Sequence, residues 1–309
     1  MEIEEALQEV PFLVLDGAMA TEMERRGYAI QDDLWSAVAL YRFPNVIREI
    51  HLSYLQAGVD IITTASYQTT TVGFMRKGFS AEEARGLMRK AVTIAKEVRA
   101  QFWQRLSERK PIWVAASLGP YGAYLADGSE YRGQYGKSRE ELAEFHQERM
   151  DILLEEKPDL LAFETVPCLL EAEAIGDLLR NRRDSQAWIS FSCQDGVRTC
   201  GGDWLRDCAA ALDEMPQVKA VGVNCTNPCY VESLIREIRK ETEKPVVVYP
   251  NSGEIFDTET REWTGSSVDF SAYGRRWQAA GARIIGGCCR TGPAQIRQLK
   301  GIVAAQHEA

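Results

Sequence analysis

Short apolar runs, many of them rich in β-branched residues, recur along the chain and are separated by longer stretches of mixed polarity. Eight such runs are present, at 12–16, 60–66, 112–119, 159–165, 187–193, 219–225, 244–250 and 282–289. Their near-continuous apolar character is typical of strands that are buried on both faces, as in parallel sheets. We therefore expect eight parallel β-strands.

The stretches between these runs have the spacing and the end signals of α-helices. Ser80 with Glu83, and Ser138 with Glu141, form two capping boxes, and each is followed by apolar residues at helical spacing. Two further helical stretches are followed by glycine, at 58 and 281, the residue that favours a left-handed C-terminal cap. The pattern predicts strands that alternate with helices.

This alternation, without a linker rich in Pro, Gly or Ser, favours the α/β class and a single (β/α)8 TIM-type barrel domain over residues 1–309. The alternative is an open parallel sheet. No Gly-x-Gly-x-x-Gly or Walker-type loop follows an early strand, and Gly286 and Gly287 lead into a cysteine pair instead of a phosphate loop. The barrel is therefore the preferred interpretation.

Composition and charge narrow the class of partner. The 309 residues are 45% hydrophobic and carry a net charge of −9, which argues against nucleic acid or an anionic membrane as partner. The N-terminus, MEIEEALQEV, lacks the order of a secretory signal, and no apolar run is long enough to span a bilayer. We expect a cytoplasmic protein whose eight cysteines stay reduced and available as ligands.

Chemically reactive residues gather where the predicted strands end, and in a barrel these ends converge on the face that holds the active site. They are Asp16, Tyr67, Ser117, Glu164, Cys193, Cys225, Tyr249, Asn251, Cys288 and Cys289. Cys225 ends the sixth strand, and the pair Cys288 and Cys289 ends the eighth, so both ends flank the seventh strand. Three thiolates suit zinc and leave a fourth position for substrate or water. We expect a catalytic site with one Zn²⁺ per chain.

The other candidate ligands have simpler interpretations. Five further cysteines are expected to be small buried or incidental thiols, namely Cys168, Cys193, Cys200, Cys208 and Cys229. His51 and His146 fall within helical patterns and His307 lies near the C-terminus, so none of them is at a strand end. We expect no catalytic residue beyond the metal site, because a thiol bound to zinc loses its proton without a general base.

Six segments resemble the homocysteine S-methyltransferase family. They lie at 15–22, 117–135, 163–165, 222–225, 249–254 and 286–291, from the first strand to the eighth, so the resemblance covers essentially the whole chain. The segment 117–135 most resembles the stand-alone members that take methyl from S-methylmethionine or S-adenosylmethionine. The resemblance implies that the protein methylates homocysteine to methionine with a small sulfonium donor.

The resemblance also implies roles for individual residues. It implies that the three strand-end cysteines bind zinc, that Asp16 and Glu164 hold the amino group of homocysteine, and that Tyr67 lies near the metal. Two carboxylates suit an ammonium group. The competing interpretations are a turn residue for Asp16, a buried ion pair for Glu164 and simple packing for Tyr67.

One loop of the resemblance adds a further possibility for the donor. It contains Tyr121, Tyr124, Tyr131 and Tyr135, which could offer cation–π contacts to a cationic donor. For each tyrosine taken singly, a structured surface loop is the preferred interpretation.

Other functions compete with a sulfonium-dependent methyltransferase. They are a betaine-using homocysteine methyltransferase, a zinc-dependent hydrolase or lyase, and a non-enzymatic zinc-binding barrel with Cys193, Cys229 or Asp16 as fourth ligand. The chain stops soon after its eighth predicted helix, so we expect neither folate or cobalamin modules nor the C-terminal arm of the betaine branch. The oligomeric state stays open.

Overall fold

The eight predicted runs all form strands, and these strands build one parallel sheet. A computed structural model describes residues 3–28, 35–257 and 262–307. The strands are β1 (Leu13–Val14), β2 (Ile61–Thr63), β3 (Trp113–Leu118), β4 (Leu160–Val166), β5 (Ala187–Phe191), β6 (Val218–Asn224), β7 (Val246–Tyr249) and β10 (Ala282–Ile285). They pair in the order β1-β10-β7-β6-β5-β4-β3-β2.

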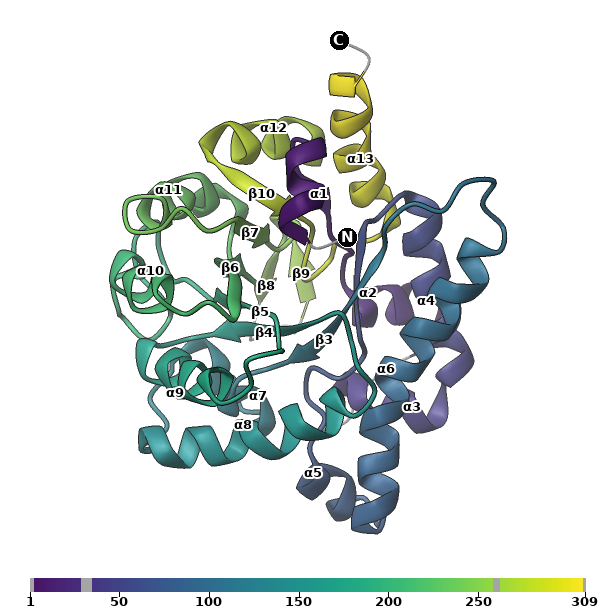
Figure 1. Cartoon of the computed structure of the whole chain (residues 1–309), viewed down its shortest axis with the longest axis vertical. Helices are drawn as coiled ribbons and strands as arrows, with labels where there is room; N and C mark the ends of the chain where they lie inside the picture. The colour runs from purple at the N-terminus through teal and green to yellow at the C-terminus, as the bar shows by residue number, and fades with distance from the viewer. Residues whose placement is uncertain (1–2, 29–34, 258–261, 308–309) are drawn as a thin grey trace.

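The two ends of this sheet meet. Leu15, just after β1, forms a parallel bridge with Ile61 of β2, and the Asp60 amide donates to the Val14 carbonyl at 2.7 Å. The sheet therefore closes into a barrel with helices around it, as Figure 1 shows. The predicted α/β barrel is confirmed, and the open sheet is wrong.

The helices follow the predicted alternation. They are α1 (Ile3–Glu9), α2 (Met19–Arg25), α3 (Ala39–Arg42), α4 (Pro44–Ala57), α5 (Thr71–Arg76), α6 (Ala81–Trp103), α7 (Tyr121–Leu125), α8 (Arg139–Leu154), α9 (Leu169–Arg180), α10 (Leu205–Asp213), α11 (Pro228–Ile238), α12 (Phe270–Ala280) and α13 (Pro293–His307), with 3-10 turns η1 (Trp35–Val38) and η2 (Ser129–Tyr131). Both predicted capping boxes are present, at the starts of α6 and α8. Gly58 and Gly281 end α4 and α12 in the left-handed conformation, as expected.

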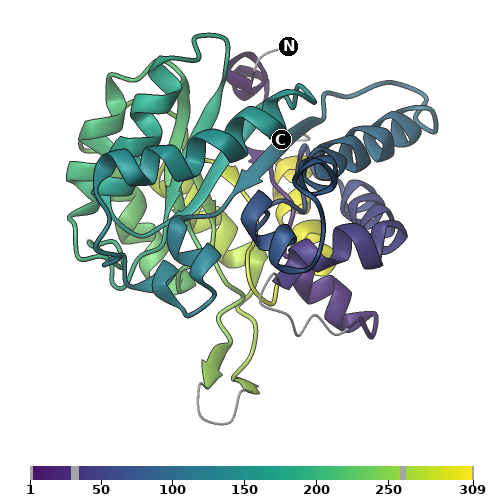
Figure 2. The same ribbon diagram turned by 90° about the horizontal axis from the view of Figure 1, so that it is seen from below.

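Two local features differ from the sequence-based expectation. The last barrel strand ends at Ile285, and the next two glycines lie in tight quarters: a Cβ on Gly286 would lie 2.7 Å from Leu15 Cβ, and one on Gly287 would lie 2.4 Å from Thr291 Oγ1. The cysteine pair therefore lies in the loop after the strand. An antiparallel hairpin of β8 (Ile255–Asp257) and β9 (Glu262–Thr264), which the sequence did not predict, projects from the barrel (Figure 2).

The barrel interior is apolar at its N-terminal end. Side chains alternate along each strand, so Ala115 and Trp188 face the interior cluster while neighbours such as Val114 and Ile189 pack under the helices. Helix α1 belongs to the interior cluster and closes this end, and Arg283 donates from its guanidinium to the carbonyls at 7, 10 and 11. Polar side chains are thereby left to the other end of the barrel.

The histidines lie on helices, away from the strand ends. His51 on α4 and His146 on α8 are fully buried, and His307 is the last residue of α13. Within the described ranges, no helix combines the length and the apolar character needed to cross a bilayer.

Candidate active site

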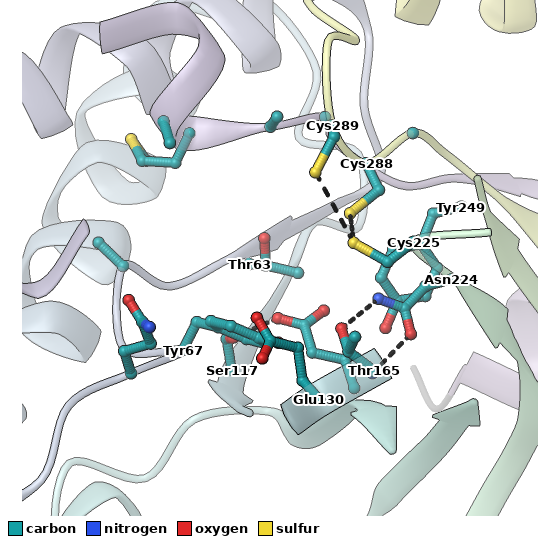
Figure 3. A pocket seen from close by; sticks show the side chains of 18 of the residues that line it. Thr63, Tyr67, Ser117, Glu130, Thr165, Asn224, Cys225, Tyr249, Cys288 and Cys289 are labelled. Atoms are coloured by element: carbon teal, nitrogen blue, oxygen red, sulfur yellow. Dashed lines mark hydrogen bonds between the residues drawn. The ribbon is translucent and has the colours of Figure 1, made fainter. Parts of the chain in front are cut away.

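A cavity of about 400 Å³ opens at the C-terminal ends of the barrel strands (Figure 3). Its wall includes Asp16, Thr63, Tyr67, Gln68, Ser117, Glu130, Tyr131, Glu164, Thr165, Asn224, Cys225, Tyr249, Cys288 and Cys289. The structure thus brings all six predicted metal- and substrate-site residues to one cavity. Cys193 and Asn251, which were also expected at this face, do not line it; the Asn251 Oδ1 instead accepts from the Cys289 amide at 3.2 Å.

Three thiols converge at one side of this cavity. Cys225 Sγ lies 2.7 Å from Cys288 Sγ and 3.8 Å from Cys289 Sγ, and all three cysteines are free. A tetrahedral zinc ion with Zn–S bonds of about 2.3 Å separates its sulfur ligands by roughly 3.8 Å, so the donor set fits once the closer pair opens by about 1 Å. No fourth His, Cys, Asp or Glu joins this group in the described part of the chain. The group is therefore open toward the cavity.

The backbone that carries the cysteines is held in tight turns. Cys225 has a φ of 49°, and Arg290, one residue after the cysteine pair, has a φ of 66°. The Cys288 amide donates to the Pro250 carbonyl at 2.7 Å, and the Thr291 amide donates back to the Cys288 carbonyl at 3.0 Å. Left-handed conformations at non-glycine residues cost free energy and concentrate at functional sites. These turns keep the three thiols aimed at one point.

Two carboxylates, the buried Asp16 and the half-buried Glu164, face the same cavity without a cationic partner among the described residues. Asp16 accepts hydrogen bonds from the Thr63 amide at 2.8 Å and the Thr63 hydroxyl at 3.0 Å, and Glu164 accepts one from Ser117 Oγ. Burial raises the pKa of Asp16 to about 8 and the pKa of Glu164 to about 7. Since no described Lys, Arg or His forms an ion pair with either group, a cationic ligand would favour their ionised forms.

A polar network that includes two residues of the cavity wall fixes the end of β4. The Asn224 side chain accepts from the Thr165 amide at 2.6 Å and donates to Thr165 Oγ1 at 2.8 Å, while Ser190 Oγ donates to the same Asn224 oxygen at 2.8 Å. Thr165 has a φ of 63°, a rare conformation for a β-branched residue. The network therefore sets the direction of the neighbouring Glu164. Our sequence reasoning assigned no role to Asn224 or Thr165, although both lie in the quoted family segments.

The loop that carries Tyr67 is fixed by a buried arginine. The guanidinium of Arg149, on α8, donates to the carbonyls of Tyr67 at 2.7 Å, Thr69 at 2.9 Å and Gly119 at 2.7 Å. The Tyr67 ring packs on Gly119, where a Cβ would lie 2.7 Å from the ring. The sequence did not single out Arg149, because nothing local shows which carbonyls a helical arginine reaches.

Replacing Arg149 with methionine should lower the free energy of unfolding by about 2–4 kcal/mol, since buried carbonyl oxygens lose their donors. Urea unfolding followed by circular dichroism would measure the change. The matched control is Arg85→Met, because Arg85 is an exposed arginine that pairs with Glu148 at 3.2 Å. Such a surface pair contributes about 1 kcal/mol or less. Equal effects of the two substitutions would contradict the role given to Arg149.

The tyrosine nearest the thiols is Tyr131. Its hydroxyl donates to Cys225 Sγ at 3.6 Å, and no such bond from Tyr67 is found among the described residues. Tyr121, Tyr124 and Tyr135 instead pack around one another and Phe145, with Tyr121 5.1 Å from Phe145 between ring centroids. Tyr131 is exposed on a structured loop, as expected, and it also lines the cavity, which the sequence did not show.

Comparisons with known proteins agree with this geometry. The family model described as homocysteine S-methyltransferase matches residues 13–303. The chain is 50% identical over 303 residues to homocysteine S-methyltransferase YbgG of Bacillus subtilis (strain 168), covering 96% of each protein. It is 50% identical over 299 residues to homocysteine S-methyltransferase 2 of Zea mays, covering 93% of this chain and 88% of that protein.

A solved structure shows the same similarity in three dimensions. The metallated form of the homocysteine methyltransferase MmuM from Escherichia coli superposes with a TM-score of 0.89 at 42% identity, covering 97% of this chain and 99% of that one. On this evidence the chain belongs to the homocysteine S-methyltransferase family.

Proposed function

We propose that this enzyme transfers a methyl group from a sulfonium donor, with S-methylmethionine preferred, to homocysteine, and that Cys225, Cys288 and Cys289 hold one zinc ion for this reaction. The observation that carries the proposal is a three-thiol group, open on one side, in the same cavity as two carboxylates, Asp16 and Glu164, that have no cationic partner in the described ranges. The site draws on residues from both ends of the sequence, which supports the whole chain, 1–309, as one domain; residues 1–2, 29–34, 258–261 and 308–309 of that span lie outside the described ranges.

The chemistry of the thiol group supports zinc as the metal. Three soft sulfur ligands with one open position suit a zinc ion that binds a further sulfur ligand. A zinc ion held there would lower the pKa of the homocysteine thiol, which is about 8.5 for a free thiol, and so supply a thiolate at neutral pH. His51 and His146 are buried on helices and no histidine lines the cavity, so no described imidazole is placed to act as the base instead.

The carboxylates orient the acceptor. We assign the α-ammonium group of homocysteine to Asp16 and Glu164, because an ammonium supplies further hydrogen-bond donors and the positive charge that neither carboxylate meets among the described side chains. The acceptor would then be held at its amino end by carboxylates and at its sulfur end near the thiols. Tyr67, whose pKa is raised well above its usual range by burial, stays protonated and forms part of the wall between them.

The transfer itself needs alignment more than proton transfer. The homocysteine thiolate attacks the methyl carbon of the donor, a new S–C bond forms, and the bond from that carbon to the positive sulfur breaks. The electron pair of the broken bond goes to the departing sulfur, which leaves as a neutral thioether. No general acid is required, and holding the three atoms in line supplies several kcal/mol of the barrier reduction.

A donor panel with homocysteine as acceptor tests the proposal. We expect kcat/KM for methionine formation to fall in the order S-methylmethionine, S-adenosylmethionine, betaine. Homocysteine and donor must share a cavity of about 400 Å³, which favours a compact donor over one that carries adenosine. Betaine is compact and cationic, but its leaving amine is poorer than a thioether.

The outcomes of this panel separate the competing functions. If betaine matched or exceeded S-methylmethionine, the donor assignment would be wrong and the metal-thiolate chemistry would survive. If zinc-loaded enzyme methylated homocysteine with none of these donors, the proposed function would be replaced by that of a zinc-dependent hydrolase or lyase or of a zinc-binding protein.

A further inference from the structure

Glu130 belongs to the cavity wall and has no part in the proposed handling of homocysteine. It lies in η2, on the loop between β3 and α8, and Figure 3 shows its side chain among the residues of the cavity. Two contacts fix its backbone. Ser192 Oγ, at the end of β5, donates to the Glu130 carbonyl at 3.1 Å, and a Cβ on Gly122 would lie 2.3 Å from the Glu130 nitrogen. The backbone of Glu130 is therefore held in place by its contacts with Ser192 and Gly122.

One carboxylate oxygen of Glu130 accepts no hydrogen bond from the described residues. This atom, Oε2, is buried. The nearest cation, Arg132, is engaged elsewhere: its guanidinium donates to the Asp127 carbonyl at 3.3 Å and to Ser129 Oγ at 3.1 Å. A buried carboxylate oxygen without a hydrogen-bond partner is costly and calls for an explanation, even on a side chain that is half-buried as a whole. A cationic ligand in the cavity would remove this cost.

Two neighbours place Glu130 at the reacting end of the cavity. Tyr131, the next residue, donates to Cys225 Sγ, and the pKa of Glu130 is raised first by burial and also by the charge of Cys225. The single ammonium of homocysteine already has two carboxylates assigned to it, so the third is left for the second substrate.

We propose that Glu130 determines donor specificity by placing its carboxylate against the positively charged sulfur of the methyl donor. The inference rests on the proposed sulfonium donor and adds the residue that recognises it. Glu130 is held by Ser192 and Gly122 and forms no ion pair among the described residues, and Arg132 acts on its charge only at longer range, so the carboxylate can face the donor.

The chemistry of the transfer gives this contact a distinct kinetic signature. The donor is positive before the reaction and neutral after it, and its charge is already partly lost in the transition state. A nearby carboxylate therefore stabilises the bound donor at least as much as the transition state. Removing the charge should raise KM for the donor without lowering kcat.

The test uses zinc-loaded, full-length Glu130→Gln with S-methylmethionine and homocysteine. We expect KM for S-methylmethionine to rise about tenfold or more, as for the loss of one contact to a charged group, while kcat and KM for homocysteine stay within about twofold. The matched control is Asp127→Asn, which removes one negative charge from the same loop outside the cavity wall and keeps the oxygen that accepts from the Ser129 amide. It should leave all three constants near those of the wild type.

Tetramethylammonium serves as a second probe, because it has the charge and the methyl groups of a sulfonium without an amino acid portion. It should inhibit competitively with the donor, and its Ki should rise in Glu130→Gln but not in Asp127→Asn. An unchanged KM for the donor in an active Glu130→Gln enzyme would overturn the proposal. An unchanged Ki for tetramethylammonium would also overturn it, because the contact would then be with the donor's ammonium group and not with its sulfur. If wild-type enzyme used no sulfonium donor at all, the proposed function itself would fail, a result distinct from both.

Discussion

Replacing Cys288 with alanine is expected to remove the bound metal and to reduce methionine formation to the background of the assay, while the barrel stays folded. Cys288 Sγ lies 2.7 Å from Cys225 Sγ in a group of three ligands, so its loss leaves two thiols, too few to hold zinc in a site of this kind. The cysteine lies in the loop after β10, outside the hydrophobic core clusters, so the fold does not depend on it. Metal content per chain measures the loss of the metal, and circular dichroism measures whether the barrel stays folded; both are independent of activity.

The matched control for this experiment is Cys229→Ala. Cys229 is an exposed free cysteine on α11 that does not belong to the three-thiol group, so its replacement should keep one metal ion per chain and full turnover. Stoichiometric metal in Cys288→Ala would refute the ligand assignment, whatever happened to activity.

Asp16→Asn and Glu164→Gln should each lower kcat/KM for homocysteine by about one to two decades, with metal content unchanged. Each substitution removes a charge-assisted hydrogen bond to the ammonium group, a loss of roughly 1.5–3 kcal/mol. Asn and Gln keep the size of the side chain and the oxygen that accepts from Thr63 or Ser117. Steady-state kinetics with homocysteine varied, together with metal analysis, would measure both effects.

Asp16 should also give homocysteine use a dependence on pH. Burial raises the pKa of Asp16 to about 8, so in the free enzyme this carboxyl is neutral below that pH and ionised above it. Only the ionised form attracts the ammonium, so kcat/KM should rise with pH through about 8, and this part of the profile should be missing in Asp16→Asn. The bound ammonium favours the ionised carboxylate, so the dependence should be weaker in kcat.

The raised pKa also predicts how Asp16→Asn affects stability. A carboxyl whose pKa is higher in the folded than in the unfolded protein makes the fold less stable as pH rises from about 4 to 8. A neutral asparagine avoids that cost, so the variant should be at least as stable as the wild type near pH 8. Asp151→Asn, which changes a partly exposed carboxylate paired with Arg182, serves as the control for charge removal alone.

The kinetic predictions share one refuting outcome. Near-normal homocysteine kinetics in both Asp16→Asn and Glu164→Gln would show that these carboxylates do not bind the ammonium group.

The sequence alone determined the eight barrel strands, their alternation with helices and the thiols of the site. Strands buried on both faces must be apolar nearly throughout, and helix ends must satisfy their own backbone groups. Both requirements are therefore visible in short stretches of sequence, as apolar runs and as capping residues. The capping box of Ser80 with Glu83 is such a signal, complete within four neighbouring residues. The cysteines could be placed because the ends of neighbouring parallel strands converge wherever a barrel closes.

Tertiary structure decided which other side chains meet at the site. Arg149 reaches the Tyr67 carbonyl across 82 positions of sequence, and Asn224 holds Thr165 across 59. Glu130 looks like any glutamate of a polar loop until Gly122 and Ser192 are seen to pack against its backbone. Periodicity records how a residue relates to its near neighbours along the chain. These contacts depend instead on the relative placement of whole elements, which is set only when the barrel closes and its loops pack together.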